Sequence, residues 1–480
     1  MSSYQSSQSG LPQFRLVLSS FMQHDGLPFA DALPEEEIQQ AFEDAGANFA
    51  QDDDAVYTPA VTLWAFLSQV LFKGELRSCL AAVGRVVVLW VALGRKPCSD
   101  NSGAYCRARA KLPVPVLQRL ALDLADNCED QLPGAWLWMG KHVHLVDGTT
   151  VSMPDTSENQ ADYPQPETQE PGLGFPLARL VLLFSLASAM VQGVAVGPYA
   201  GKETGETALL RELFGRLLPG DVLLGDRFFC SYFMIALLME KGIDVVVRLH
   251  QRRAADFRRG RRLGPDDHLV IWTRPQRPQW MDQETFDRMP ATLAVRELQV
   301  HVHQPGFRVE SLVVVTTLAD ADTYSKDDVA ELYQQRWLAE LDIRALKITL
   351  GIDVLRCQTP EMVRREIWVA MLAYNLIRRS MLQAALRDDP TGTMGRSPRQ
   401  FSFTAALQKV AASWATLAHG QETWLVLLIE VQLQHIGKQI IGDRPGRVEP
   451  RAVKRRPKPH KLLTKPRKER RAELLIGAEQ

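Results

Sequence analysis

The chain has 480 residues, which is enough for about two to four domains that each bury a core. Apolar residues make up 46% of the chain and charged residues 23%, which are ordinary globular values and exclude disorder except at the ends. Its 56 Lys and Arg residues balance 56 Asp and Glu residues, so the total charge excludes a histone-like protein.

Charge is distributed unevenly between the two ends. Acidic residues crowd residues 34–54, whereas residues 444–471 are rich in Arg and Lys, with only Glu449 and Glu469 opposing them. This split is a weak indication of nucleic-acid binding. Six cysteines without a Cys-x-x-Cys pair predict neither a zinc site nor a disulfide framework, and the polar residues 1–10 predict no secretory signal. We therefore expect a cytoplasmic protein.

The N-terminal third has the periodicity of helices. After an arm over residues 1–55, apolar residues recur at helical spacing from Val61, and a second apolar helix is expected over 78–93. Ser99 and Asp100 are candidate caps for a short basic helix over 104–111. We expect residues 1–135 to form a helical DNA-binding domain.

That short helix carries three cations, which are Arg107, Arg109 and Lys111. Affinity for DNA comes mainly from Lys and Arg at phosphates, so this helix is the candidate element that recognises DNA ends. A solvated helix face is the alternative.

From His142 the period changes to that of strands. Residues 142–153 predict one strand, 180–197 two more and 221–224 a fourth, with a helix over 206–218. Residues 180–197 are apolar enough to resemble a membrane span, but polar side chains interrupt them, so two buried strands are the better interpretation. No membrane partner is expected. The alternation of strands and helix predicts a mixed α/β core, whose first part covers residues 136–228.

A β-rich insertion is expected over residues 229–325. It contains Val-rich segments at 244–250, 268–273, 292–303 and 311–317. Helices over 326–350, 360–386 and 403–436 complete the core and its C-terminal helical region, residues 326–440. Residues 441–480 form a basic, flexible tail, of which 454–471 could bind DNA nonspecifically or be merely soluble.

Two aspartates stand where apolar strands end. Asp147 is followed by Gly148 and two threonines, and Asp226 by Arg227. Either one alone is often only a turn former or a helix cap. As a pair on one sheet, they could share divalent metal ions, which prefer hard oxygen ligands.

A third candidate site lies in the helix over 326–350. Tyr333, Arg336, Glu340 and Lys347 fall on one face at about 100° per residue, flanked by Arg344 and Trp337. The simpler alternative is an amphipathic helix with a solvated Arg336–Glu340 pair. An excess of cations around one carboxylate suits a helix that completes a metal site and grips phosphates.

Three segments, VDGTT, LLGDRFFCSY and YQQRWLAELDIRALK, resemble the catalytic blocks of the insertion-sequence-four family of bacterial DDE transposases. The similarity covers most of residues 57–436, and Tyr333, Arg336, Glu340 and Lys347 reproduce the family's helix spacing. The resemblance implies an RNase H-like catalytic core in which Asp147, Asp226 and Glu340 bind two Mg²⁺ ions, with Mn²⁺ as a substitute. It also implies that the β-rich domain is inserted before the glutamate.

The resemblance further implies the partners. Tyr333, Arg336 and Lys347 would contact the transposon end, with Arg227 and Arg344 beside them. The substrates would be double-stranded DNA, namely terminal inverted repeats and target DNA, bound by a homodimer in a synaptic complex associated with the nucleoid. Trp272 and Trp280 are candidates for stacking on a flipped base, or else core residues.

The expected reaction is metal-dependent DNA cleavage and strand transfer, by in-line attack at phosphorus without a covalent protein–DNA intermediate. A tyrosine recombinase is disfavoured because Tyr333 lacks the Arg/His cluster that such chemistry needs. An RNase H-like host nuclease and a catalytically silent DNA-binding protein derived from a transposase remain as alternatives.

Overall fold

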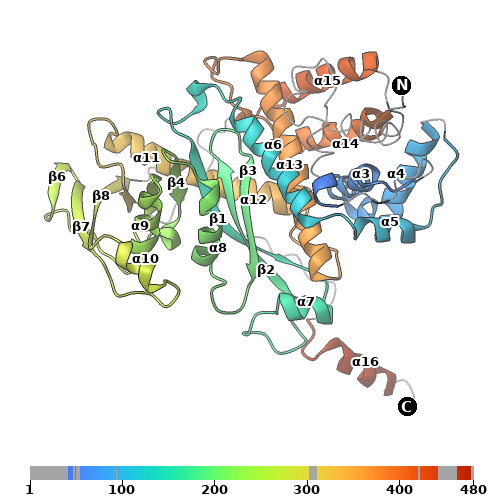
Figure 1. The fold of residues 1–480 in the computed structure, drawn as a ribbon, viewed down its shortest axis with the longest axis horizontal. Coiled ribbons are helices and arrows are strands. Elements are labelled where there is room, and N and C mark those ends of the chain that lie inside the picture. The colour runs from blue at the N-terminus through green and yellow to red at the C-terminus, as the bar shows by residue number, and fades with distance from the viewer. Residues whose placement is uncertain are drawn as a thin grey trace, which may run out of the picture.

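The computed structural model describes residues 42–46, 49, 55–92, 95–301, 311–419, 422–441 and 462–476. Figure 1 shows strands β6–β8 at one end of the molecule, strands β1–β3 in the middle, and helices α3–α5 at the other end. Most of the arm predicted over residues 1–55 lies outside the described residues, but Phe42 is buried in the core.

One mixed sheet of nine strands runs through the described part of the chain, in the order β3-β2-β1-β4-β5-β9-β8-β7-β6. β4 is parallel to both β1 and β5, and the other neighbours are antiparallel. The strands are β1 (Val143–Ser152), β2 (Leu177–Ser185), β3 (Val191–Pro198), β4 (Val222–Gly225), β5 (Asp244–Arg248), β6 (Arg261–Gly264), β7 (Asp267–Thr273), β8 (Thr292–His301) and β9 (Ser311–Thr316).

The central strands are almost wholly apolar because both faces of the sheet are covered. Short helices connect or flank the strands, and α8 packs on β2 and β3 while α9 packs on β5. These helices are α7 (Ser157–Asp162), α8 (Glu206–Glu212), α9 (Tyr232–Glu240) and α10 (Gln283–Arg288). The predicted helix over 206–218 is therefore shorter, and α9 was not predicted.

The segment predicted as a β-rich insertion does not form a separate sheet. β5 pairs with β4 of the central strands, and β9 pairs with β5, so β6–β9 extend the same sheet. The strand predicted over 244–250 thus belongs beside the central strands. The Val-rich segments predicted β5, β7, β8 and β9 correctly but carried no information about their partners. β6 was not predicted.

The N-terminal helices are α3 (Pro59–Leu71), α4 (Cys79–Ala92), α5 (Ser102–Arg109) and α6 (Val114–Glu129). Thr58 caps α3, where Pro59 occupies the first turn, and Asn101 caps α5 by accepting from Gly103 N. The expected caps Ser99 and Asp100 do not fill this role. Asn101 does, because it immediately precedes the first helical residue.

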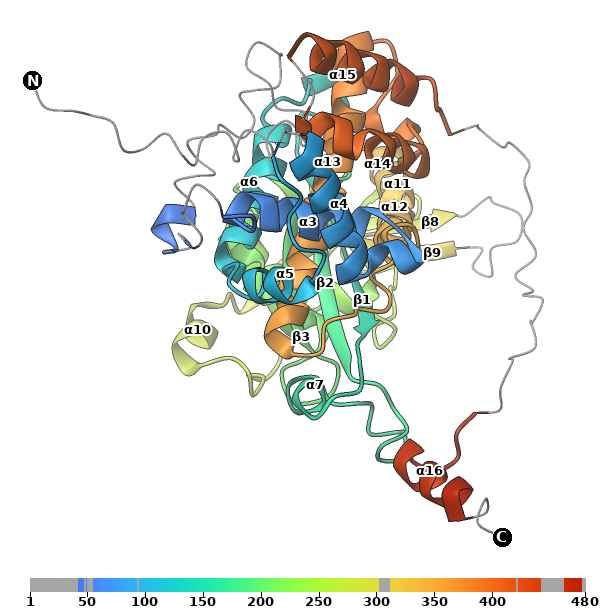
Figure 2. The same ribbon diagram turned by 90° about the vertical axis from the view of Figure 1, so that its right-hand side faces the viewer.

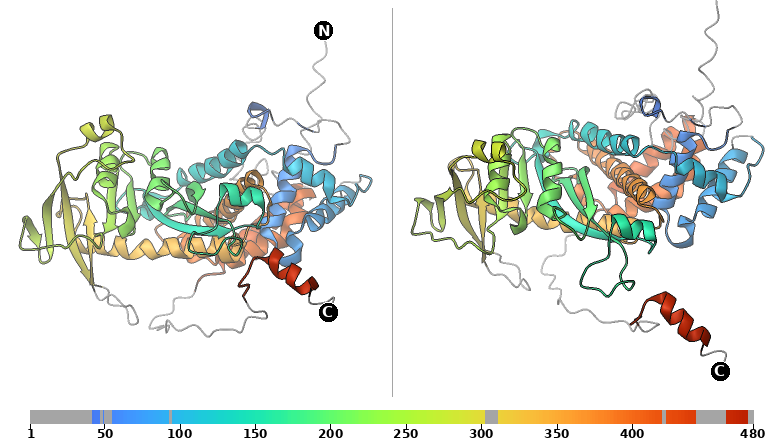
Figure 3. Two further views of the ribbon diagram at one scale, coloured as in Figure 1. Left: turned by 90° about the horizontal axis from the view of Figure 1, so that it is seen from below. Right: turned by 60° about the horizontal axis from the view of Figure 1, so that its bottom comes forward.

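The expected single helix over residues 326–350 is a succession of helical segments. α11 (Lys326–Gln334) leads into a 3₁₀ turn, η6 (Gln335–Trp337), then α12 (Leu338–Arg344) and a π-helical stretch, η7 (Ala345–Leu350). Gly351 then takes a left-handed conformation and ends the run. Figure 3 shows this run, in light orange, extending from the β-rich end toward the helical end.

Helix α13 (Pro360–Asp388) forms the spine of the helical half. It packs against α3, α6, α14 (Phe403–His419) and α15 (Glu422–Gly437), and most of its residues are buried (Figure 2). Among the described residues, no helix is long and apolar enough to span a membrane.

The C-terminal tail is not wholly irregular. Residues 467–476 form α16 (Arg467–Ile476), which Figure 1 shows beside α7, whereas residues 442–461 and 477–480 lie outside the described part. Within α16, Arg470 pairs with Glu473, which also pairs with Lys465. The flexibility of the tail stays a prediction.

Candidate active site

Asp147 lies in β1, between the antiparallel strand β2 and the parallel strand β4. Its side chain is 22% exposed, and its Oδ1 accepts a hydrogen bond of 2.8 Å from Gly148 N. Burial raises the pKa of Asp147 to about 6, while Gly148 N and Arg336 oppose the shift and nearby Glu206 and Glu340 add to it. The site is therefore crowded with negative charge.

Asp226 directly follows β4, the parallel neighbour of β1. Leu224 lies opposite Leu145, so Asp226 and Asp147 both come two residues after paired positions on adjacent parallel strands. The Asp226 carboxylate also caps η5 (Arg227–Phe229) by accepting from Phe228 N at 3.3 Å. The two aspartates are thus brought to the same edge of the sheet, as their sequence positions predicted.

Arg336 links two of the predicted carboxylates. Its guanidinium is 2.8 Å from Glu340 Oε1 and 4.0 Å from Asp147 Oδ2, and α12 packs against β1. The Glu340 side chain is 62% exposed. The ion pair expected for a simple amphipathic helix is therefore present, but it lies against the aspartate of the sheet.

Tyr333 is buried beside this group, and burial raises the pKa of its hydroxyl to about 12. The charge of Asp226 acts in the same direction, whereas Arg336 and Arg248 oppose it. Tyr333 thus lies within electrostatic reach of the second aspartate. A phenol with this pKa stays neutral and can donate a hydrogen bond at neutral pH.

Lys347 lies further along, in η7. Its Nζ donates to Thr150 O at 2.8 Å and pairs with Asp353 Oδ1 at 2.9 Å. Because η6 and η7 depart from α-helical geometry, a uniform helical wheel does not describe its position. Lys347 nonetheless contacts β1, only three residues after Asp147.

The remaining predicted cations differ in accessibility. Arg344 is exposed, and Arg227 donates to Gln251 at 3.2 Å. Arg107 is exposed, as is Lys111, which lies over the Phe49 ring.

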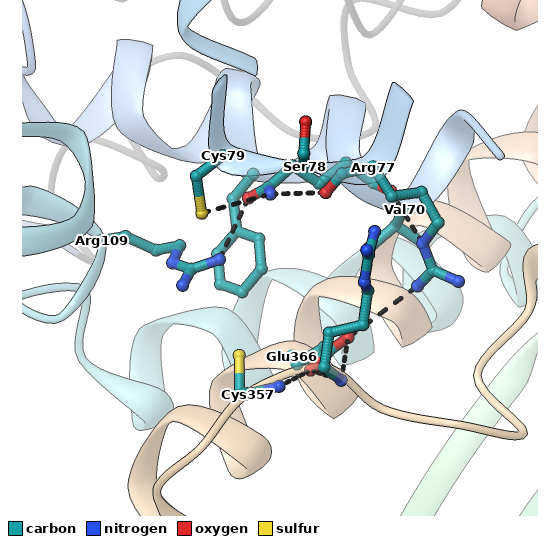
Figure 4. Close-up of a pocket in the computed structure, with 10 residues that line it drawn as sticks. Val70, Arg77, Ser78, Cys79, Arg109, Cys357 and Glu366 are labelled. Atoms are coloured by element: carbon teal, nitrogen blue, oxygen red, sulfur yellow. Dashed lines mark hydrogen bonds and ion pairs between the residues drawn. The ribbon is translucent and has the colours of Figure 1, made fainter. Parts of the chain in front are cut away.

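Arg109 instead points into a pocket between the N-terminal helices and the segment before α13 (Figure 4). It donates to Gln69 Oε1 at 3.1 Å and lies over the Phe66 ring. The three cations therefore do not form one surface, because helical spacing turns Arg109 toward the core.

Both candidate tryptophans have an arginine over the ring. Trp272 is 5% exposed, donates to Glu297 at 3.0 Å and has Arg253 over its ring at 3.9 Å. Trp280 is half-buried, with Arg211 over its ring at 3.9 Å. Trp272 is therefore a core residue, which was the alternative to base stacking.

Sequence reasoning missed Glu206, the first residue of α8. A Cβ atom on Gly148 would lie 2.4 Å from Glu206 Cδ, so this side chain lies directly against the backbone next to Asp147. Burial raises the pKa of Glu206, and the charge of Asp226 adds to the shift. No periodic pattern indicates this proximity; the Gly148 position was the only clue in the sequence.

The donor set fits a divalent metal, because all four acidic side chains offer hard carboxylate oxygens. Within the described ranges, no three His, Cys, Asp or Glu side chains already converge as a metal cluster. Arg336 instead neutralises Glu340 and approaches Asp147. Binding of an ion would require the Glu340 carboxylate to leave Arg336.

Comparisons with known proteins bear on the family of the chain. A family model described as a transposase DDE domain matches residues 138–376. The Escherichia coli transposase InsG of insertion sequence element IS4 is 27% identical over 373 residues, covering 76% of this chain and 78% of that protein. A probable transposase of element IS5377 from Geobacillus stearothermophilus is 24% identical, over 56% of this chain and 64% of its own. A solved piggyBac transposase synaptic complex with hairpin DNA aligns over 90% of this chain and 87% of its own with a TM-score of 0.42 and 9% identity.

Proposed function

Since the chain belongs to the IS4 family of DDE transposases, we propose that it performs DNA cleavage and strand transfer with Asp147, Asp226 and Glu340 as its catalytic carboxylates. The protein is a transposase, and its family depends on a divalent metal. One observation supports the residue assignment. The guanidinium of Arg336 lies 2.8 Å from Glu340 Oε1 and 4.0 Å from Asp147 Oδ2, so Glu340 on the helix lies close to Asp147 on β1.

The proposed catalytic core is RNase H-like. The order β3-β2-β1-β4-β5 supports it, with β1, β4 and β5 parallel and β2 antiparallel to β1. In this proposal residues 136–228 and 326–440 form the core and C-terminal helices. Residues 229–325 are the β-rich insertion between them, and its first strand, β5, continues the core sheet. Residues 1–135 form the DNA-binding domain, and 441–480 a basic tail.

We assign two Mg²⁺ ions to the site, with Mn²⁺ as a substitute. Bound metal ions activate a water or a DNA 3′-hydroxyl and stabilise the leaving oxygen. Asp147 and Asp226 are fixed ligands, since one lies within β1 and the other directly follows β4. Glu340 is the adjustable ligand, because its side chain is exposed and moves only by breaking one ion pair.

The cations around the carboxylates would bind DNA phosphates. Arg336 is released when Glu340 turns to the metal, which leaves its guanidinium free to make a charge-assisted contact. Lys347, Tyr333, Arg227 and Arg344 border the same region. The substrate is proposed to be the terminal inverted repeats and then target DNA, held in a synaptic complex by a homodimer.

The test uses DNA that carries the inverted repeats flanking the gene. Asp147→Asn, Asp226→Asn and Glu340→Gln should each lower metal-dependent cleavage by about 1000-fold, which corresponds to roughly 4 kcal/mol, because each removes a ligating charge. Binding of the DNA should persist.

Cleavage within about tenfold of wild type in one variant would reject that residue as a ligand. Joining of the cleaved end to a second DNA distinguishes a transposase from a nuclease that only cuts. Loss of DNA binding together with cleavage would indicate misfolding, which thermal unfolding of the same samples detects.

A further inference from the structure

Glu206 is a fourth carboxylate at the edge of the sheet where Asp147 and Asp226 lie. It begins α8, which packs on β2 and β3 and contacts η5, the turn that Asp226 caps. The opposite flank of the aspartates is occupied by α12, which carries Glu340. Glu206 therefore approaches the aspartates from a different element than Glu340 does.

Gly148 provides the space that Glu206 occupies. A Cβ atom at residue 148 would lie 2.4 Å from both Cδ and Oε1 of Glu206 and 2.7 Å from its Cγ. Three side-chain atoms, including one carboxylate oxygen, thus fill the position of the missing side chain. Any larger residue at 148 would push Glu206 away from Asp147.

The Glu206 carboxylate has no hydrogen bond or ion pair with any residue in the described ranges, although the side chain is half-buried. Arg179, whose charge acts on Glu206, is engaged elsewhere, since it donates to Thr204 O at 2.7 Å and lies over the Tyr199 ring. Glu203, by contrast, pairs with Arg211 at 2.7 Å. A half-buried carboxylate without a partner carries a desolvation cost that a cation would offset.

We propose that Glu206 is a further ligand of the catalytic metal site, on the side of Asp147 opposite Glu340. This inference rests on the proposed function, which supplies the divalent ion. Glu206 adds a hard oxygen that stays at the site before DNA arrives, whereas Glu340 is held by Arg336. The side chains of Asp147, Asp226 and Glu206 do not yet converge as a metal cluster in the described residues. We therefore expect them to close around an ion that binds in the absence of DNA.

The test measures Mn²⁺ binding to the DNA-free full-length protein from the electron paramagnetic resonance signal of free Mn²⁺. Glu206→Gln should weaken Mn²⁺ binding roughly 10–100-fold and raise the Mg²⁺ concentration for half-maximal cleavage in the same direction. Glu212→Gln is the matched control, because it removes an exposed carboxylate from the same helix and should bind Mn²⁺ as wild type does. Affinity within about twofold of wild type for Glu206→Gln would overturn the inference.

Asp147→Asn distinguishes this failure from failure of the proposed function. Loss of Mn²⁺ binding in Asp147→Asn together with normal binding in Glu206→Gln would reject only the role of Glu206. Normal binding in both would reject the site itself.

Gly148→Ala provides an independent test. It should reproduce the loss seen in Glu206→Gln, because the new methyl group occupies the space of the carboxylate, and it should cause no additional loss in a Glu206→Ala background. Additive losses would show that Gly148 serves another purpose and would overturn the geometric argument. Thermal unfolding of each variant identifies any that misfold.

Discussion

Glu340 and Asp342 lie two residues apart on α12, yet their environments are opposite. The Glu340 side chain is 62% exposed and has one partner, Arg336. The Asp342 side chain is 1% exposed and accepts from Arg378 at 2.7 Å, Arg399 at 3.0 Å and Tyr374 at 3.3 Å. One face of the helix holds a carboxylate that can change partners, and the other holds one that cannot.

The buried network explains how the exposed carboxylate is positioned. Arg378 belongs to α13 and Arg399 to η8 (Pro398–Gln400), and Arg399 also donates to Ser185 O at the end of β2. Asp342 therefore ties α12 to the helical spine and to the sheet. Asp342 thus fixes α12 in place, whereas Glu340, on the same helix, can exchange Arg336 for a metal ion.

The largest effect on stability is expected when the anchor is broken. Asp342→Asn leaves Arg378 and Arg399 without their buried counter-charge, so it should lower the free energy of unfolding by about 3–5 kcal/mol. Glu340→Gln should lower it by only a few tenths of a kcal/mol, about the value of an exposed i,i+4 pair. Urea unfolding measures both, and equal losses would contradict the division of roles.

Arg336→Ala should affect function more than stability. Removing its charge-assisted contact with a phosphate should raise the barrier to end cleavage by about 1.5–3 kcal/mol and weaken binding of the cognate end. Cleavage kinetics and thermal unfolding measured together separate this from a structural effect. Full activity in Arg336→Ala would leave only the exposed ion pair as its role.

The sequence predicted the parts of this site that depend on local pattern. Asp147 and Asp226 were visible because each ends an apolar run, and the four-residue spacing of Arg336 and Glu340 correctly predicted their contact. Glu206 was missed because the pairing of β2 with β1 and β3, which brings α8 to Gly148, depends on contacts between distant segments. Residues 326–350 are helical as predicted, but the helix is not uniform, because it includes the 3₁₀ turn η6 and the π-helical stretch η7, which apolar spacing did not indicate.

The sequence pattern also did not predict which side chains point toward the core and which toward solvent. Arg109 and Arg107 are two residues apart on α5, yet Arg109 contacts Gln69 and Arg107 is exposed. Trp272 and Trp280 were both plausible stacking residues, and only the packing of β7 on β8 made Trp272 a core residue. Their functional roles stay predictions.

The raised pKa of Asp147 should make the free energy of unfolding depend on pH. Burial raises its folded-state pKa to about 6 from the ordinary value of 3.8, so the folded protein binds the extra proton and loses stability as pH rises through this interval. Asp147→Asn removes that cost and should be more stable than wild type at neutral pH by about 3 kcal/mol in the absence of metal. The advantage should shrink as pH falls from 6 toward 4. Urea unfolding in the presence of a chelator checks this, and an advantage that does not depend on pH would contradict it.

The smallest effect on stability is expected for Arg344, on the exposed face of α12. Arg344 is exposed, two residues beyond Asp342, and makes no hydrogen bond or ion pair within the described ranges. Arg344→Ala should therefore change the free energy of unfolding by less than about 0.5 kcal/mol. If Arg344 contacts one DNA phosphate, the slope of log affinity against log salt should fall in magnitude by about 0.9, and by the same amount on cognate and unrelated DNA. Arg107→Ala on α5 is a matched comparison, since it also removes an exposed cation from the end of a helix. An unchanged salt slope in Arg344→Ala would remove Arg344 from the proposed DNA contacts.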